Sequence, residues 1–235
     1  MSESSHRPTK LAKTLFGFNA LVAWCGVLLS FSLHASGYYP PNTTDLTQLG
    51  NNPVGLDGLV GRVFDWFTYF TILSNLVVAI VLTLLFIRPG RDSKLLRVLR
   101  LDSLLMIIIT GILYNLLLGQ GVAHEGLDFF SNGLQHVTTP IVTVLVWLIV
   151  GPRGWISWKV IALSLIIPVA WAFFALIRGA VIGAYPYPFL DVATKGLASV
   201  LVFIAVIAVV AVILALVLMA IDAAITALTR RTKTN

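Results

Sequence analysis

The chain has 235 residues, of which 58% are hydrophobic and 11% are charged, and its mean hydropathy is +0.93. Soluble globular domains carry about 25% charged residues, so this composition excludes an ordinary soluble domain and indicates a polytopic membrane protein. The net charge of +6 does not indicate nucleic-acid binding, because the basic residues are distributed among the connections between apolar runs.

Six apolar segments are long enough to cross a bilayer core, which takes about 20 residues of helix. They lie at about 11–34, 66–87, 99–118, 134–150, 157–178 and 194–221. No stretch between them is long or polar enough to form another domain. The sequence therefore predicts an all-α fold, a single transmembrane bundle of six helices over residues 1–235.

Basic residues are enriched in the connections that face the cytoplasm. Thirteen of the 16 Lys and Arg lie in the two terminal segments and in the second and fourth connections, among them Arg7, Arg230, Arg231 and Lys233. The exceptions are Arg62, Arg178 and Lys195. This asymmetry predicts cytoplasmic N- and C-termini, in agreement with an even number of spans, for a multi-pass protein of the plasma or inner membrane.

The first span has a second interpretation, as a signal peptide cleaved near Ala35-Ser36-Gly37. Its apolar run of some 20 residues exceeds the signal-peptide core of about 7–15 residues, which favours a retained span. The lone Cys25 leaves the chain without an internal disulfide or a thiolate metal site. The outside loop at about 35–65, rich in Gly, Pro and Asn, is either a lid over the bundle mouth or a passive surface loop.

Polar residues recur on one face of the second span. Thr68, Thr71, Ser74 and Asn75 are spaced at i, i+3, i+6 and i+7, which gathers them on one side of a helix. A threonine in a membrane helix usually returns its hydroxyl to its own i−4 carbonyl. The pattern therefore leaves Thr71 open to a structural role as well as a chemical one.

The fourth span begins with Gln135, His136, Thr138 and Thr139, followed by Pro140. An ionisable side chain inside a membrane is costly and marks a functional site by default; the alternative is a histidine that hydrogen-bonds a neighbouring helix. Proline has no N–H, so Pro140 frees the carbonyl of His136 and predicts a kink there. Irregular backbone at this depth is tolerated where it lines a cavity, which predicts a cavity for water and a lipid-like substrate.

The second and fourth spans run in the same direction, so their first turns lie at similar depth near the outer surface. Thr71 and His136 are therefore expected to meet there. A hydroxyl beside a neutral imidazole is the minimum for covalent acyl transfer, since the imidazole accepts the hydroxyl proton and the oxygen attacks.

Four further charged residues lie within or beside the spans. Asp102 and Asp222 are expected at the cytoplasmic ends, solvated or paired with Arg97, Arg100 or Arg230. Arg178 and Asp191 are expected on the outer side, where either one orients His136 or holds a substrate carboxylate.

Several common catalytic motifs are absent from the sequence. It contains no Gly-x-Ser-x-Gly elbow, no His-Glu-x-x-His, no phosphate-binding loop and no dinucleotide fingerprint. Conventional hydrolase, metalloprotease and nucleotide-binding folds are therefore unsupported.

Three segments together resemble a known family. Tyr69-Phe70-Thr71, His136-Val137-Thr138-Thr139-Pro140 and Tyr187-Pro188-Phe189-Leu190 are similar to motifs of the androgen-induced and androgen-dependent six-helix membrane hydrolases, and the stretches 69–77 and 185–191 resemble the bacterial branch. The resemblance implies hydrolysis of fatty acid esters of hydroxy fatty acids by a threonine nucleophile and a histidine. By motif match those roles fall on Thr71 and His136. Ser74-Asn75 departs from the animal proteins, which leaves the acyl preference open.

The sequence thus leads to an intramembrane lipid esterase with Thr71 as nucleophile and His136 as base. Ser74, Asn75 and Thr139 are candidate donors to the oxyanion. A lipid or fatty-acyl substrate and membrane lipids are the expected partners, with no nucleic acid, metal or organic cofactor. The alternatives are a small transporter or lipid-binding protein without hydrolytic activity, in which His136, Arg178 and Asp191 bind substrate or protons, and a structural membrane subunit.

Overall fold

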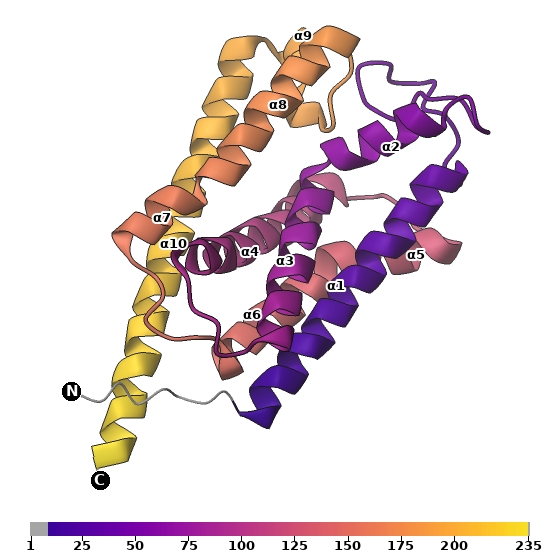
Figure 1. Cartoon of the computed structure of the whole chain (residues 1–235). Helices are drawn as coiled ribbons and strands as arrows, with labels where there is room; N and C mark the ends of the chain where they lie inside the picture. Colours follow the sequence, from indigo (N-terminus) through magenta and orange to yellow (C-terminus); the bar gives the residue numbers. More distant parts are fainter. Residues whose placement is uncertain (1–8, 235) are drawn as a thin grey trace.

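The computed structural model describes residues 9–234, with side chains as far as residue 229, and is all-α (Figure 1). Arg7 and the side chains of Arg230, Arg231 and Lys233 lie outside the described part. Six helical stretches within it are long and apolar enough to cross a membrane, namely Lys10–Ser36, Phe70–Ile87, Lys94–Leu118, Gly126–Val150, Trp158–Ile182 and Leu197–Thr229. By helix length and hydropathy this is a multi-pass membrane protein.

The elements follow one another with short connections, except for the long loop of residues 37–58 between α1 and α2. The α-helices are α1 (Lys10–Ser36), α2 (Leu59–Thr68), α3 (Phe70–Ile87), α4 (Lys94–Leu113), α5 (Gly126–Gly133), α6 (Thr139–Val150), α7 (Trp158–Ser164), α8 (Ile166–Ile182), α9 (Val192–Lys195) and α10 (Leu197–Thr234). Two π-helical turns, η1 (Tyr114–Leu118) and η2 (Leu134–Thr138), extend α4 and join α5 to α6, and η3 (Pro188–Leu190) is a 3₁₀ turn.

The spans differ from the apolar runs at their ends, because caps set the ends of helices and hydropathy does not. The third span starts at Lys94, where the Ser93 hydroxyl accepts from the Leu96 N–H at 3.2 Å. The second span starts at Phe70 and not at 66, because Tyr69 is extended (φ −71°, ψ 130°) and separates α2 from α3. The fourth starts eight residues early, because α5 continues through η2 into α6.

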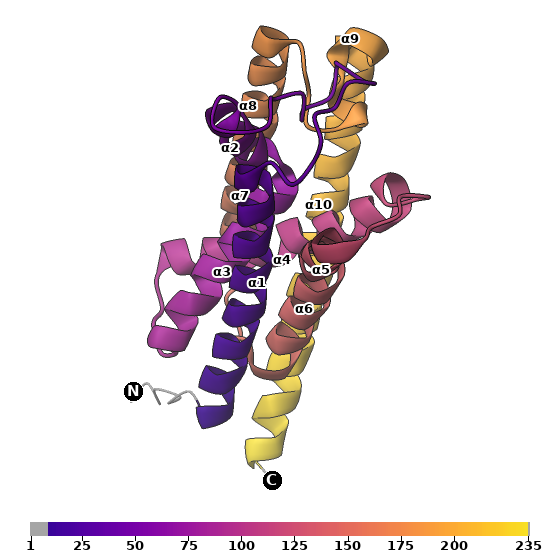
Figure 2. The same ribbon diagram turned by 90° about the vertical axis from the view of Figure 1, so that its right-hand side faces the viewer.

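α4 is the central helix of the bundle. It packs against α3 and α6 on one side and against α7 and α10 on the other, and every side chain from Arg100 to Met106 is buried. Figure 1 shows α1, α2 and α3 on one side of the molecule and α7, α8 and α10 on the other. α5 and α6 pack against α1, and the turned view in Figure 2 shows them in front of α10. α1 begins and α10 ends at the same end of the bundle.

The loop between α1 and α2 is fastened to the connection between α8 and α9. Leu49 N–H donates to the Tyr185 carbonyl at 3.0 Å, Tyr185 N–H donates to the Thr47 carbonyl at 2.8 Å, and the Thr47 hydroxyl donates to Asp191 at 2.7 Å. These contacts bring the loop between α1 and α2 and the segment before α9 together at one end of the bundle (Figure 1).

The two carboxylates expected to be solvated or paired with Arg97, Arg100 or Arg230 lie in other surroundings. Asp222 accepts from the Gly154 N–H at 2.8 Å and lies 4.0 Å from Arg153. Asp102 is fully buried and has no hydrogen-bond partner within residues 9–229. Arg97 pairs with Asp92 at 2.5 Å, and Arg100 donates to Ser103 at 3.2 Å. The pairing prediction was wrong for these described arginines, because α4 turns Asp102 into the packed interior.

Candidate active site

Thr71 lies in the first turn of α3, directly after the break at Tyr69. The first N–H groups of a helix have no acceptor within it, and the Thr71 N–H donates to the Tyr187 phenol oxygen at 3.2 Å. The break also frees the Thr68 carbonyl, which accepts from the Trp171 indole at 2.9 Å. The backbone interruption thus leaves the Thr71 hydroxyl directed toward other elements.

The Thr71 hydroxyl meets a histidine and a tyrosine. Thr71 Oγ1 lies 3.1 Å from His136 Nε2 and 3.3 Å from Tyr187 Oη. The residue four positions earlier, Phe67, belongs to α2, so the bond to an i−4 carbonyl that is usual for threonine in a membrane helix is not made. Residues 65 positions apart in the sequence therefore form a hydroxyl–imidazole pair.

His136 is held from both sides. Its ring stacks on Tyr114 with 3.7 Å between the ring centres and an interplanar angle of 18°. Its Nδ1 lies 2.7 Å from the amide oxygen of Asn132, one helical turn earlier. A carbonyl oxygen only accepts, so Nδ1 carries the proton and Nε2 presents a lone pair to Thr71. This is the tautomer that a general base needs.

The π-helical turn η2 carries His136. Pro140 supplies no N–H, and the free carbonyl of His136 accepts from the Asn115 side chain at 3.3 Å. The sequence predicted both the free carbonyl and irregular backbone here, and the irregularity takes the form of a π-turn from Leu134 to Thr138. Such turns are frequent at functional sites because they redirect side chains without ending the helix.

Tyr187 comes from the loop before η3 and is buried. Its ring stacks on Phe189 with 5.0 Å between centres. Burial raises the pKa of the Tyr187 phenol above its ordinary value. The phenol therefore stays protonated at neutral pH and keeps a hydrogen to donate.

Two of the three predicted oxyanion donors, Ser74 and Asn75, lie beside Thr71, and both are engaged by backbone. The Ser74 hydroxyl donates to the Thr71 carbonyl at 2.9 Å and lies 2.8 Å from Thr110. The Asn75 amide donates to the carbonyls of Thr71 at 2.8 Å and Gln135 at 3.3 Å. Thr139 is buried, and its hydroxyl has no partner in the described part of the chain. Ser74 and Asn75 thus fasten α3 to α4 and η2.

Arg178 and Asp191 do not contact His136. Arg178 pairs with Asp65 at 2.6 Å. Asp191 caps α9 by accepting from the backbone of Ala193 at 2.9 Å and Thr194 at 3.2 Å. Burial works against ionisation of Asp191, but hydrogen bonds from Thr47 and α9 prevail and lower its pKa. The group that orients His136 is Asn132, through its contact with Nδ1, and not Arg178 or Asp191 as expected.

Sequence reasoning missed three residues of this arrangement, namely Asn132, Tyr114 and Tyr187 in their contacts with Thr71 and His136. Asn132 precedes His136 by four residues, a helical spacing that would have revealed it, but it lies before the apolar run expected to form the fourth span. Tyr187 stands in a segment that carried the family resemblance, without an assigned role.

An apolar cavity of about 110 Å³ opens beside Thr71, between α4, α8 and α10. Its wall includes Thr71, Met106, Tyr114, Trp171, Tyr187 and Ala211. A second pocket, of about 250 Å³, lies beside the loop between α1 and α2, and its wall includes the polar side chains of His34, Asn52, Arg62 and Asp65. Tyr69 lines the second pocket and Phe70 the first, so the break between α2 and α3 lies between the two pockets.

Comparison with models of protein families, with curated proteins and with solved structures finds no match for this chain.

Proposed function

We propose that the chain is an integral-membrane lipid esterase that uses Thr71 as nucleophile and His136 as general base. The observation that supports this most directly is the 3.1 Å contact between Thr71 Oγ1 and His136 Nε2, with Asn132 holding Nδ1 in its protonated form. A nucleophile, a base and an orienting group in this order are the parts of a hydrolytic triad, which is recognised by geometry on unrelated folds.

The reaction follows from the protonation states. His136 Nε2 takes the Thr71 proton as Oγ1 attacks the ester carbonyl carbon, and the imidazolium then gives that proton to the leaving alcohol oxygen as the ester C–O bond breaks. Water attacks the resulting acyl-threonine with His136 again accepting its proton. The acid leaves, and the proton returns to Thr71.

Tyr187 is the donor we assign to the oxyanion. Its oxygen lies within 3.3 Å of both the hydroxyl and the backbone nitrogen of Thr71, so a carbonyl attacked by Thr71 comes to lie beside it. The Thr71 N–H, at the N-terminus of α3, is a second donor once the phenol turns toward the substrate.

The substrate we infer is a fatty ester, with fatty acid esters of hydroxy fatty acids as the class that the family resemblance implies. The apolar cavity beside Thr71 suits an acyl chain, since burial of each CH₂ contributes about 0.8 kcal/mol. The second pocket, beside the loop between α1 and α2, suits water or the polar end of the substrate.

We also infer that both termini lie in the cytoplasm, which puts the site near the outer leaflet. α1 begins and α10 ends at one end of the bundle, and the segments rich in Lys and Arg predict that end to be cytoplasmic. Cytoplasm-specific reporters fused to either terminus should both be active. Activity at only one terminus would contradict this topology.

The alternative function is lipid binding or transport without hydrolysis. Asp102 in α4 favours it, because a fully buried carboxylate without a partner in the described chain is unusual at membrane depth and marks proton or ion pathways in transporters. This alternative predicts that an ester binds and is recovered intact.

Hydrolysis of such an ester by the purified protein in lipid nanodiscs distinguishes the two functions. Thr71→Val keeps the volume and loses the hydroxyl, and its rate is expected to fall by about a thousandfold or more. Thr71→Ser is expected to keep a readily measured rate. Thr68→Val, which removes a buried hydroxyl that donates to the Phe64 carbonyl, serves as the control. A Thr71→Val rate within a few-fold of the parent would sink the proposal.

A further inference from the structure

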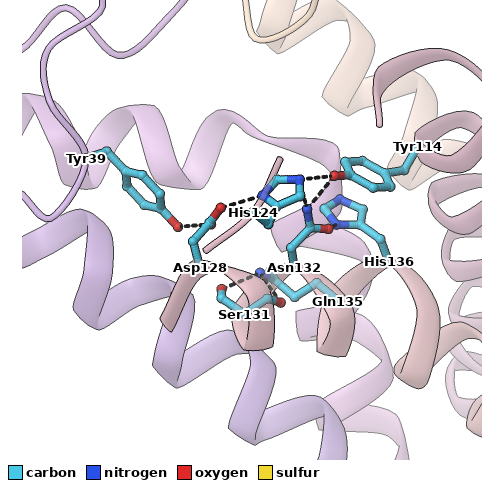
Figure 3. A network of polar contacts seen from close by, with 8 residues as sticks. All are labelled: Tyr39, Tyr114, His124, Asp128, Ser131, Asn132, Gln135 and His136. Carbon is cyan, nitrogen blue, oxygen red and sulfur yellow. Dashed lines mark hydrogen bonds and ion pairs between the residues drawn. The ribbon is translucent and has the colours of Figure 1, made fainter. Parts of the chain in front are cut away.

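A second histidine lies behind the first in a continuous polar network (Figure 3). His124 Nδ1 bonds to Asp128, whose other carboxylate oxygen accepts from the Tyr39 phenol at 2.7 Å. His124 Nε2 lies 2.5 Å from the Tyr114 phenol oxygen. His124 and Asp128 have no role in the esterase mechanism proposed for Thr71 and His136.

The Asn132 amide joins the two histidines. Its nitrogen bonds to His124 Nε2 and to the Tyr114 phenol, and its oxygen faces His136 Nδ1. Figure 3 shows the amide standing between the two imidazole rings. The two ends of an amide differ little in shape, so the hydrogen-bond partners decide which end faces which ring.

The partners fix the amide in one orientation while His124 is neutral. The Asp128 carboxylate accepts from Nδ1–H of His124, which leaves Nε2 with a lone pair. That lone pair accepts from the Tyr114 hydroxyl or the Asn132 amide, both of which are donors. The amide nitrogen therefore points toward His124 and the amide oxygen toward His136.

We propose that His124 and Asp128 are positioning residues that set the tautomer of His136 through the orientation of the Asn132 amide. The tautomer claim stands on the network alone, and its consequence for catalysis rests on the proposed function. While His124 is neutral, His136 keeps its proton on Nδ1 and its lone pair toward Thr71.

Protonation of His124 reverses the arrangement. His124 Nε2 then carries a hydrogen and faces the N–H₂ group of the Asn132 amide, so two hydrogen-bond donors face each other. Rotation of the amide by half a turn relieves this and presents N–H₂ to His136 Nδ1. His136 Nδ1 must then accept a hydrogen bond, so its proton leaves to solvent and another proton binds His136 Nε2. With a hydrogen on Nε2, the His136 ring can only donate to Thr71 and no longer acts as a base.

The groups around His124 come from four elements. Asp128 lies on α5, Tyr114 on η1 and His136 on η2, and Tyr39, in the loop after α1, bonds to Asp128. His34 of α1 packs against Tyr39 with 4.8 Å between ring centres. Histidines in general change charge between about pH 5 and 8, and the experiments below cover that range.

The direct test is ¹⁵N NMR of the histidine rings in the full chain in detergent, which distinguishes Nδ1–H, Nε2–H and charged imidazole without any substrate. Signals are assigned by their loss in single His→Gln variants. In the parent, His136 is expected to change from Nδ1–H to Nε2–H as His124 becomes charged. In His124→Gln, which keeps an acceptor and a donor without titrating, His136 should stay Nδ1–H over the same range.

Two further variants sharpen this test. Asn132→Asp has two acceptor oxygens and cannot present a donor to His136, so Nδ1–H should persist at acid pH. His34→Gln changes a histidine behind the network and should respond to acid as the parent does. If His124→Gln and the parent change alike, or if His136 in the parent keeps Nδ1–H while His124 is charged, the proposal is overturned.

Hydrolysis rates separate this inference from the proposed function. The fall in kcat between pH 8 and 5 should be smaller in His124→Gln than in the parent by a factor on the order of 10 to 100, the size of effect known for groups that orient metal-bound histidines. Equal pH profiles would overturn the catalytic part of the proposal. A tautomer change without any hydrolysis would uphold the positioning and overturn the esterase.

Discussion

At the scale of single residues, the candidate site depends on which groups around Thr71 donate hydrogen bonds and which accept them. The Asn132 oxygen fixes the proton of His136 on Nδ1, and Nε2 then accepts from the Thr71 hydroxyl. The Tyr187 phenol has its own hydrogen left for an oxygen nearby, because burial raises its pKa and keeps it neutral. In the proposed mechanism Thr71 is thus the nucleophile, His136 the base and Tyr187 the hydrogen-bond donor to the oxyanion.

Replacing Tyr187 by phenylalanine tests its role as oxyanion donor. Removing one such donor costs about 10²–10³ in kcat, so Tyr187→Phe should lower kcat by that order with KM changed by no more than a few-fold. Tyr185→Phe is the matched control, because Tyr185 lies in the same connection but packs its ring against Gly179. Equal kcat in the two variants would remove Tyr187 from the oxyanion site.

At the scale of elements, two π-turns bring the site together. η1 carries Tyr114 at the end of α4, η2 carries His136 ahead of α6, and the two rings stack. Close approach of these helices depends on Gly111 of α4, where an added Cβ would lie 3.2 Å from Pro140 and 3.4 Å from the His136 carbonyl oxygen. The space at Gly111 therefore sets how far η2 stands from α4.

Gly111→Ala is expected to lower kcat on the order of tenfold while the protein stays folded. The added methyl pushes the rigid Pro140 ring and shifts His136 by a few tenths of an ångström, and a displacement of about 1 Å costs on the order of 10²-fold. Gly133→Ala is the control, since a Cβ there has nothing within 4 Å. Steady-state kinetics of both variants give the comparison, and unchanged kcat in Gly111→Ala would show that the helix spacing is not critical.

The sequence predicted the spans and part of the site. Hydropathy and helical periodicity suffice for the six spans and for one shared face of Thr71, Ser74 and Asn75, because both follow from regular helix geometry. Pro140 identified the free carbonyl of His136, because in a regular helix that carbonyl accepts from the N–H that proline lacks. The break at Tyr69 was missed because no Pro or Gly marks it, and the π-turn in the fourth span inserts a shift that hydropathy does not report. Asn132 was missed because the polar start of that helix lies outside the apolar run.

At the scale of the whole molecule, α4 separates two groups of helices and the apolar cavity lies on one side of it. α8 and α10 form the outer wall, and most of their side chains face outward. Thr71 reaches the cavity from α3 and Tyr187 from the loop before η3. An acyl chain in this cavity would therefore extend along α10 toward Ala211.

Filling the cavity at Ala211 should change the preference for chain length. Ala211 is 5% exposed and lines the cavity, so Ala211→Phe is expected to lower kcat/KM for a palmitate ester by about tenfold or more. Hydrolysis of a butyrate ester should stay within a few-fold of the parent, which also shows that the variant folds. Val209→Phe, at a position 58% exposed on the same helix, is the control. Equal losses for both esters would argue against an acyl site here.

In the proposed mechanism Thr71 is an activated nucleophile. Reaction of the purified protein with a fluorophosphonate probe, followed by mass spectrometry of the adduct, tests it most directly. We expect an adduct on Thr71 of the parent that is absent from Thr71→Val and His136→Gln. A folded parent that remains unlabelled, or a label that persists in both variants, would contradict it.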